Sequence, residues 1–361
     1  MTESGLSTPS AQYSCTRVRV PGKVILSGEH AVVYGTPALA CAIQKYAFAT
    51  VTKANFVGVH LKFLGFDIDQ RFSYSNLVDM AQQIQSRHHR YVAGTAPLSA
   101  VVSNPVEFFT AALGASGLPY LLGNSFDKQS GLIIELSMDL VAGGGMGSSA
   151  ALVAAMLAAV FKHIGAPLTD AELIAKTTQS EHWQHGRSSG LDPYVCVMGG
   201  VQQYQQGTGT SMAFEPKAFN QCFLITTGRP ASSTGECVEA VRKSNFPATL
   251  WHQFSTVQQD LLKAIQAENS ALMVNAIAAN HKLLQHIGVV PEAVANFVAN
   301  VESSDAAAKV CGAGSIVGDN GGLVLVTGFQ FDQLKRLCQQ YNYTFQQMIP
   351  DMQGVSYLDE L

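Results

Sequence analysis

A glycine loop between a strand and a helix constrains the fold of this chain more than any other feature. Four glycines fall within residues 143–147, and Ser148 and Ser149 follow directly. The apolar, β-branched run 132–140 predicts a strand before the loop, and the alanine-rich residues 149–163 favour a helix after it. Glycines let a backbone approach a ligand closely, and a helix start offers unpaired N–H groups and partial positive charge. The loop therefore predicts an anion site suited to a polyphosphate.

A plainer interpretation is that Ser148 or Ser149 only caps the helix and that the glycines only form a tight turn. Four glycines in five residues exceed what a cap requires, which favours phosphate binding. Two common phosphate motifs are excluded, because no G-x-x-x-x-G-K-[ST] occurs and the G-x-G-x-x-G spacing fails at Ser148 and again at Val317. The motif set of protein kinases is also absent.

The remaining patterns predict two domains, as the length of 361 residues suggests. Strand-like runs cluster early in the chain, and strands and helices alternate later, which favours mixed sheets with helices on one face. The polar stretch 208–219 is the predicted boundary. We therefore expect a flexible leader at 1–14, an N-terminal domain at 15–215 and a C-terminal domain at 216–361.

The predicted elements can be given by range. The expected strands are 16–20, which Pro21-Gly22 should break, and 38–43, 47–53, 57–64, 132–140, 200–205, 222–226, 323–327 and about 355–358. The expected helices are 76–91, 105–113, 149–163, 170 to about 185 with Thr169 as N-cap, several between 235 and 302, and 331–341.

Composition narrows the function classes. The net charge of −4 gives no electrostatic footprint for nucleic acid or an anionic membrane. The longest apolar run, residues 150–161, is shorter than the roughly 20 residues that span a bilayer. Seven scattered cysteines without a C-x-x-C pair give no support to a zinc site and predict buried free thiols. Because residues 1–14 also lack the features of a secretory signal, we expect a cytoplasmic protein.

Three separated segments resemble the motifs of the GHMP kinases. The first is Val20-Pro21-Gly22-Lys23-Val24-Ile25-Leu26-Ser27-Gly28-Glu29-His30-Ala31-Val32-Val33-Tyr34-Gly35. The second is the glycine loop, and the third is Lys309-Val310-Cys311-Gly312-Ala313-Gly314 with the strand after Gly322. The resemblance implies an α+β, two-domain GHMP kinase fold, with a left-handed β-α-β unit in the N-terminal domain and a ferredoxin-like C-terminal domain. ATP and a small-molecule substrate would meet between the domains.

Within this superfamily, the segment Gly28–Gly35 is typical of mevalonate kinases, whereas phosphomevalonate kinases usually carry Tyr at the position of His30. Residues 181–192 and 280–289 resemble two further mevalonate kinase segments. The resemblance therefore implies ATP- and Mg²⁺-dependent phosphorylation of the 5-hydroxyl of mevalonate. The family also leads us to expect a homodimer.

The resemblance assigns Asp192 and Lys23 to catalysis. Asp192 would accept or orient the proton of the acceptor hydroxyl, and Lys23 would stabilise the developing alkoxide. Taken singly, Asp192 could be a surface turn residue before Pro193, and Lys23 a solvated loop lysine. The surrounding motifs favour the catalytic roles for both.

The nucleotide and its metal are assigned to the glycine loop and the helices behind it. Ser149 and Glu181 would hold Mg²⁺, which prefers hard oxygen donors. The alternative for Glu181 is an exposed helix carboxylate paired with His185 at i,i+4. The residues expected at the ATP phosphates are Gly143, Gly144, Gly145, Met146, Gly147, Ser148, Ser149 and Ala150.

The substrate end is assigned to Glu29, His30 and Thr234. His30 alone would more often be a structural histidine, and Thr234 could equally be the N-cap of a following helix. The third motif departs from the usual glycine run, because residues 312–322 are longer and interrupted, and Ala142 replaces the usual proline before the glycine loop.

Two competing functions remain open from the sequence. A phosphomevalonate kinase would need extra cationic residues for its phosphorylated substrate, and the region around His30 offers few. A GHMP-fold binding or regulatory protein without catalysis would have lost Lys23, Ser149, Glu181 or Asp192, and all four are present.

Overall fold

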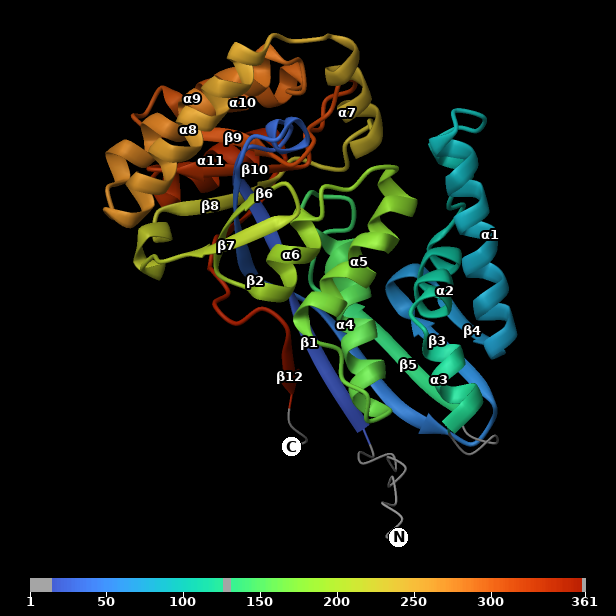
Figure 1. The fold of residues 1–361 in the computed structure, drawn as a ribbon. Helices are drawn as coiled ribbons and strands as arrows, with labels where there is room; N and C mark the ends of the chain where they lie inside the picture. Colours follow the sequence, from blue (N-terminus) through green and yellow to red (C-terminus); the bar gives the residue numbers. More distant parts are fainter. Residues whose placement is uncertain (1–14, 126–130, 359–361) are drawn as a thin grey trace, which may run out of the picture.

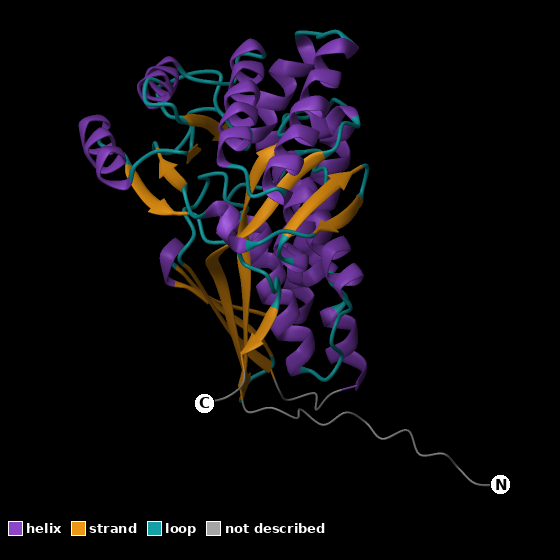
Figure 2. Cartoon of the chain, turned by 90° about the vertical axis from the view of Figure 1, so that its left-hand side faces the viewer, coloured by secondary structure: helices purple, strands orange, loops and turns teal. Residues whose placement is uncertain are grey.

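Two β-sheets organise the chain, one in each half of the molecule (Figure 1). The computed structural model describes residues 15–125 and 131–358, so the predicted leader lies outside the described residues. The first sheet has eight strands and is largely N-terminal, and the second has four strands from the C-terminal half. Helices cover the larger sheet on one side, which is visible edge-on in Figure 2. The arrangement confirms the α+β class.

The first sheet has the strand order β12-β1-β2-β5-β3-β4, with β6 added to β2 and β7 added to β6. Its strands are β1 (Cys15–Ser27), β2 (Ala38–Ala54), β3 (Gly58–Phe63), β4 (Ile68–Phe72), β5 (Gly131–Met138), β6 (Val201–Gln205), β7 (Thr208–Met212) and β12 (Ser356–Leu358). The helices of this half are α1 (Tyr74–Val92), α2 (Pro105–Ala115), α3 (Leu118–Ser125), α4 (Ser148–His163), α5 (Asp170–His185) and α6 (Leu191–Met198), with the 3-10 turns η1 (Ala31–Tyr34), η2 (Leu64–Phe66) and η3 (Leu98–Ala100).

The predicted break of the first strand at Pro21-Gly22 is wrong. β1 runs on to Ser27 and absorbs the two residues as a shift in its pairing with β2 between Pro21 and Gly22. A β-carbon at Gly22 would lie 2.3 Å from Cδ2 of Leu140 and 2.8 Å from the carbonyl oxygen of Met146. The bulge therefore brings β1 directly against the two ends of the glycine loop, which a strand without a glycine there could not approach.

Other differences come from tertiary pairing. The expected strands 38–43 and 47–53 form the single strand β2, because β1 pairs along nearly its whole length. In the N-terminal half, the expectations missed β4, α3 and α6, and they also missed β7, which occupies the start of the expected boundary 208–219. β7 pairs with β6 and so extends the first sheet.

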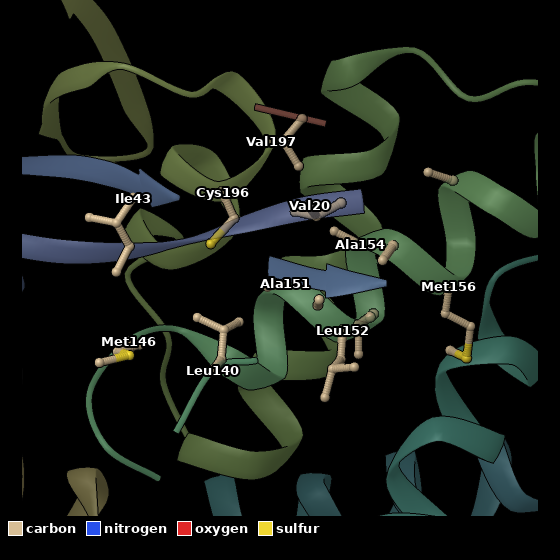
Figure 3. Close-up of a cluster of buried hydrophobic side chains, with 14 of the residues drawn as sticks. Val20, Ile43, Leu140, Met146, Ala151, Leu152, Ala154, Met156, Cys196 and Val197 are labelled. Atoms are coloured by element: carbon tan, nitrogen blue, oxygen red, sulfur yellow. The ribbon is translucent and has the colours of Figure 1, made fainter. Parts of the chain in front are cut away.

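Helix α4 lies against β1 and β2 and carries the core of the N-terminal half. From Ala150 to Phe161 every side chain is buried, so the helix has no polar face. Its many alanines let it pack closely on the sheet. Leu140, before the glycine loop, and Met146, near the end of the loop, join the same apolar cluster as Ala151 and Cys196 (Figure 3). Two apolar anchors thus fix the ends of the loop.

The second sheet has the antiparallel order β11-β8-β10-β9. Its strands follow the chain order β-α-β-β-α-β, which is the ferredoxin-like arrangement. The strands are β8 (Cys222–Thr226), β9 (Ala307–Cys311), β10 (Leu323–Thr327) and β11 (Thr344–Gln347). The helices are α7 (Thr234–Lys243), α8 (Ala248–Gln266), α9 (Ser270–His286), α10 (Glu292–Glu302) and α11 (Phe331–Tyr341), with the 3-10 turn η4 (Pro216–Phe219) before β8. The ferredoxin-like expectation is confirmed.

The end of the chain returns to the first sheet. β12 pairs with β1, so residues expected to belong only to the C-terminal domain contribute to both sheets. Buried Asp351 secures this return, because its carboxylate accepts hydrogen bonds from the Tyr46 hydroxyl at 2.8 Å and from the backbone N–H of Gly354 at 2.8 Å.

Two further sequence expectations can be compared with the structure. Among the helices of the described chain, none is both long and apolar enough to cross a membrane. The predicted buried free thiols are confirmed for six cysteines, which are Cys41, Cys196, Cys222, Cys237, Cys311 and Cys338.

Candidate active site

The glycine loop ends in an uncapped helix start. The N-cap of α4 is Gly147, at φ 69°, and no side chain makes a capping hydrogen bond there. The interpretation of Ser148 or Ser149 as the N-cap is therefore wrong. The first turn of α4 directs its backbone N–H groups toward the loop, as the predicted phosphate site requires. Gly143 and Gly145 also have positive φ angles, of 66° and 88°, which only glycine adopts without strain.

Lys23 and Asp192 meet beside this loop. Nζ of Lys23 lies 3.1 Å from Oδ1 of Asp192 and donates to the carbonyl oxygen of Gly145, also at 3.1 Å. Lys23 is 2% exposed, so it is not a solvated loop lysine. Asp192 stands in the first turn of α6, two residues after the N-cap Gly190 at φ 84°, and its side chain is 30% exposed. The buried ammonium group of Lys23 is thus paired with the carboxylate of Asp192, which remains partly exposed to solvent.

Glu181 is buried on α5 and faces the same region. It is 2% exposed, so its contact with His185, at 3.4 Å between Oε2 and Nε2, is not the surface pair of the alternative interpretation. Burial alone would raise the pKa of Glu181, but His185, the Ser149 hydroxyl and Lys23 outweigh it and lower the pKa below its ordinary value. The same contact raises the pKa of His185 despite burial. The carboxylate is therefore held in its charged form.

One oxygen of this carboxylate fits a metal ion. Oε1 of Glu181 is buried and has no hydrogen-bond partner among the residues that the structure describes. An unpartnered buried carboxylate oxygen is costly unless a cation or water completes it. The hydroxyl of Ser149 lies beside it, so both donors are hard oxygens of the kind that Mg²⁺ prefers.

The segment 28–35, called the substrate motif below because it holds the expected substrate residues Glu29 and His30, is anchored to the second sheet. Glu29 forms a fully buried ion pair with Lys309 of β9, and its Oε2 accepts from Nδ2 of Asn280 at 3.3 Å. His30 is 1% exposed, and its Nε2 lies 3.0 Å from the carbonyl oxygen of Ala313. Burial lowers the pKa of His30, which favours the neutral ring. Direct substrate contact by Glu29 stays a prediction, since Lys309 and Asn280 already engage its carboxylate.

Sequence reasoning missed the importance of Lys309. It lies in the apolar run 306–311 and is 0% exposed. A lysine in a continuously apolar strand is rare unless it is paired, and that pattern was the available signal. Burial alone would lower the pKa of Lys309, but Cys311 and Glu29 raise it above its ordinary value, so the ammonium is charged.

Thr234 begins α7 rather than capping it. The N-cap is Ser233, which forms a capping box with Glu236, so the N-cap interpretation of Thr234 is wrong. Thr234 is exposed, and a β-carbon at the next residue, Gly235, would lie 3.7 Å from the carbonyl oxygen of His185. The start of α7 therefore lies beside the end of α5.

The irregular loop 312–322 packs against the glycine loop despite its departure from the usual glycine run. A β-carbon at Gly312 would lie 3.7 Å from Cα of Gly145, and one at Gly322 would lie 3.4 Å from the carbonyl oxygen of Gly144. Ser315 fixes the loop to the segment before α7, because its hydroxyl accepts from the backbone N–H of Ser232 at 3.1 Å. The third motif thus closes one wall of the site.

Comparison with known proteins agrees with this geometry. A family model described as the GHMP kinases N terminal domain matches residues 111–200, which include the glycine loop, Glu181 and Asp192. The chain is 29% identical over 316 residues to a mevalonate kinase from Thermococcus sibiricus, covering 81% of this chain and 85% of the relative. It is 30% identical over 251 residues to a human mevalonate kinase, covering 62% of each chain.

A solved structure shares the fold. The Methanococcus jannaschii mevalonate kinase superposes with a TM-score of 0.74 at 19% identity, over 94% of this chain and 99% of the other. The GHMP kinase fold expected from the sequence is thereby confirmed. Fold, glycine loop and sequence relatives agree, and all three make this chain similar to the GHMP kinases.

Proposed function

We propose that this protein is a mevalonate kinase, which transfers the γ-phosphoryl group of ATP to the 5-hydroxyl of mevalonate and gives 5-phosphomevalonate and ADP. The observation that carries the proposal is the Lys23–Asp192 pair beside the glycine loop. This pair supports the proposal because it would supply a proton acceptor and a cation next to a phosphate bound at the loop. The mevalonate kinases among the relatives support the choice of acceptor.

The proposed reaction needs few protein groups. Asp192 takes the proton of the 5-hydroxyl as the new O–P bond forms and the bond from the γ-phosphorus to the bridging oxygen of ADP breaks. Lys23, held by Asp192 and the carbonyl of Gly145, offsets the negative charge that develops on the attacking oxygen. The backbone of residues 143–150 would bind the phosphates of ATP.

Ser149 and Glu181 are the proposed protein ligands for Mg²⁺, which would neutralise the phosphate charge when bound. Within the described residues, no group of three His, Cys, Asp or Glu side chains could hold a metal ion. Magnesium in such sites commonly takes one or two carboxylates and completes its shell with phosphate and water.

The charge of the substrate end favours mevalonate over phosphomevalonate. Lys23, within the motif 20–35, and Lys309, which packs against it, are both paired with carboxylates, Lys23 with Asp192 and Lys309 with Glu29. A substrate that already carries a phosphate would need cations that are free to pair with it. His30 and Thr234 are proposed to contact mevalonate instead.

The domain limits belong to the same proposal. Residues 15–215 would carry the nucleotide site, and residues 216–361 would close it, except that β12 returns to the first sheet. A homodimer and a cytoplasmic location complete the proposal, and sedimentation of the purified protein would test the homodimer.

The decisive test compares ADP release from Mg²⁺-ATP with mevalonate, phosphomevalonate and galactose in parallel, with mass spectrometry of the product. We expect turnover with mevalonate and a single added phosphate. Turnover with phosphomevalonate alone would keep the fold and catalytic residues and overturn the substrate. ATP binding without turnover on any of the three would support the non-catalytic alternative.

A further inference from the structure

The Glu29–Lys309 pair is a buried ion pair in which every hydrogen-bond donor and acceptor has a partner. Both side chains are 0% exposed, and Nζ of Lys309 also donates to the carbonyl oxygens of Ile25 at 3.0 Å and Val310 at 2.9 Å. The second oxygen of Glu29 accepts from Asn280, whose own Oδ1 accepts from the Ser27 hydroxyl at 2.8 Å. Each ammonium proton and both carboxylate oxygens therefore have a partner.

Such a pair is a poor way to stabilise a fold. Two charges lose their hydration on burial, and a well-packed apolar pair of similar size is often as stable or more stable. The pair does fix geometry, because charged, hydrogen-bonded groups tolerate little displacement. The position of the pair shows which two segments it holds together.

The pair joins the substrate motif, residues 28–35, to β9, the strand whose end contacts the glycine loop. Glu29 lies within the first motif, and Lys309 lies on β9 two residues before Cys311. The carbonyl oxygen of Cys311 would lie 3.0 Å from a β-carbon at Gly145, so the end of β9 touches the glycine loop directly. His30, next to Glu29, reaches the same connection through the carbonyl oxygen of Ala313.

We propose that Lys309 is a positioning residue for phosphoryl transfer. Through Glu29 it sets the distance between the substrate motif at residues 28–35 and the glycine loop at residues 143–147. This inference rests on the proposed kinase activity. Transfer needs the reacting atoms about 3–3.5 Å apart and aligned, and a misplacement of about 1 Å can cost about 100-fold in rate. Because Lys309 is 0% exposed, it would itself touch neither substrate nor nucleotide.

The first test is Lys309→Met. We expect kcat with mevalonate to fall at least about 10-fold, while KM for ATP and KM for mevalonate change less than about 3-fold. A general loss of folded protein would lower the active fraction and the melting temperature together. The assay is therefore run well below the melting temperature and normalised to folded protein. Lys309→Arg, which keeps the charge, should recover part of kcat.

Arg87→Met is the matched control. Arg87 forms a partly buried pair with Glu107 between α1 and α2, away from β9, and its loss should lower the melting temperature without lowering kcat. A kcat of Lys309→Met within 2-fold of the original protein would overturn the inference.

A double variant separates positioning from stability, and it decides the matter even if Lys309→Met does not fold. Lys309→Met combined with Glu29→Leu removes both buried charges, which should restore the melting temperature. The inference expects kcat to stay low. Recovery of kcat together with the melting temperature would show that the pair is only structural. Failure of the proposed function is distinct, because the unaltered protein would then not phosphorylate mevalonate.

Discussion

Gly147 lies directly against Lys23, and a β-carbon built on the glycine would stand 3.1 Å from Cγ and 3.2 Å from Cε of the lysine. The same β-carbon would lie 3.5 Å from Oδ2 of Asp192. The glycine loop and the proposed catalytic pair are therefore one packed unit. A side chain at Gly147 must move Lys23 or the loop.

Gly147→Ala should lower kcat about 10-fold or more, because the new methyl group displaces Lys23 from Asp192. Gly94→Ala is the control, since Gly94 has a similar φ of 73° but no atom within 4 Å of its β-carbon position. Both variants bear the left-handed backbone strain of about 1–2 kcal/mol, and only the first disturbs the site. Equal kcat values for the two variants would contradict this account.

Asp192→Ala should lower kcat by about 10²- to 10⁴-fold, the usual contribution of a positioned general base. ATP affinity, measured by calorimetry, should change little because the proposed role of Asp192 is toward the acceptor hydroxyl and not the nucleotide. Asp260→Asn, at an exposed position on α8, is the control. Turnover of Asp192→Ala at the level of the original protein would show that another group takes the proton.

Lys23→Met should reduce kcat by about 10²- to 10³-fold, as for loss of one donor to a developing oxyanion. Because Lys23 is buried against Asp192, the variant should also melt at a lower temperature. The kinetics must therefore be measured on protein shown to be folded by circular dichroism. Lys62→Met, which removes a half-exposed lysine paired with Glu135, is the control.

Glu181→Gln should raise the Mg²⁺ concentration needed for half-maximal rate about 10-fold or more. Loss of a residue that only hydrogen-bonds to a metal ligand already weakens metal binding about 10-fold, and Glu181 is proposed as a ligand itself. Binding of Mn²⁺-nucleotide, followed by electron paramagnetic resonance, should weaken in parallel. Glu135→Gln, at an exposed carboxylate on β5, should change neither value. Unchanged metal dependence in Glu181→Gln would remove Glu181 from the proposed ligands.

His281 should make folding stability sensitive to mild acid. Burial, then the charges of Lys309 and Lys282, lower its pKa from 6.5 to about 4. The unfolded chain therefore binds a proton between pH 6.5 and pH 4 that the folded chain refuses, so stability falls as the pH falls through this window. The full difference corresponds to about 3 kcal/mol.

Urea unfolding from pH 7 to pH 4 measures this dependence. His281→Gln should flatten the slope, whereas His252→Gln, at an exposed position on α8, should leave it unchanged. An identical slope in the original protein and His281→Gln would assign the acid sensitivity to other groups.

Local chemistry let the sequence determine many of the helices and strands. The expected limits of β8, β10 and α11 match the structure, and Thr169 caps α5 in a capping box with Glu172. These features depend on periodicity, capping and turn residues, all of which act over a few neighbouring positions.

Only the tertiary structure decided the contacts between distant segments. It carried β1 through Pro21 as a bulge, returned β12 to the first sheet, placed Lys23 against Asp192 and buried Lys309 against Glu29. None of these follows from local preference, because each depends on which elements pack together after the chain folds. Motif resemblance could name Lys23 and Asp192, but the pairing of Lys309 with Glu29 became visible only in the tertiary structure.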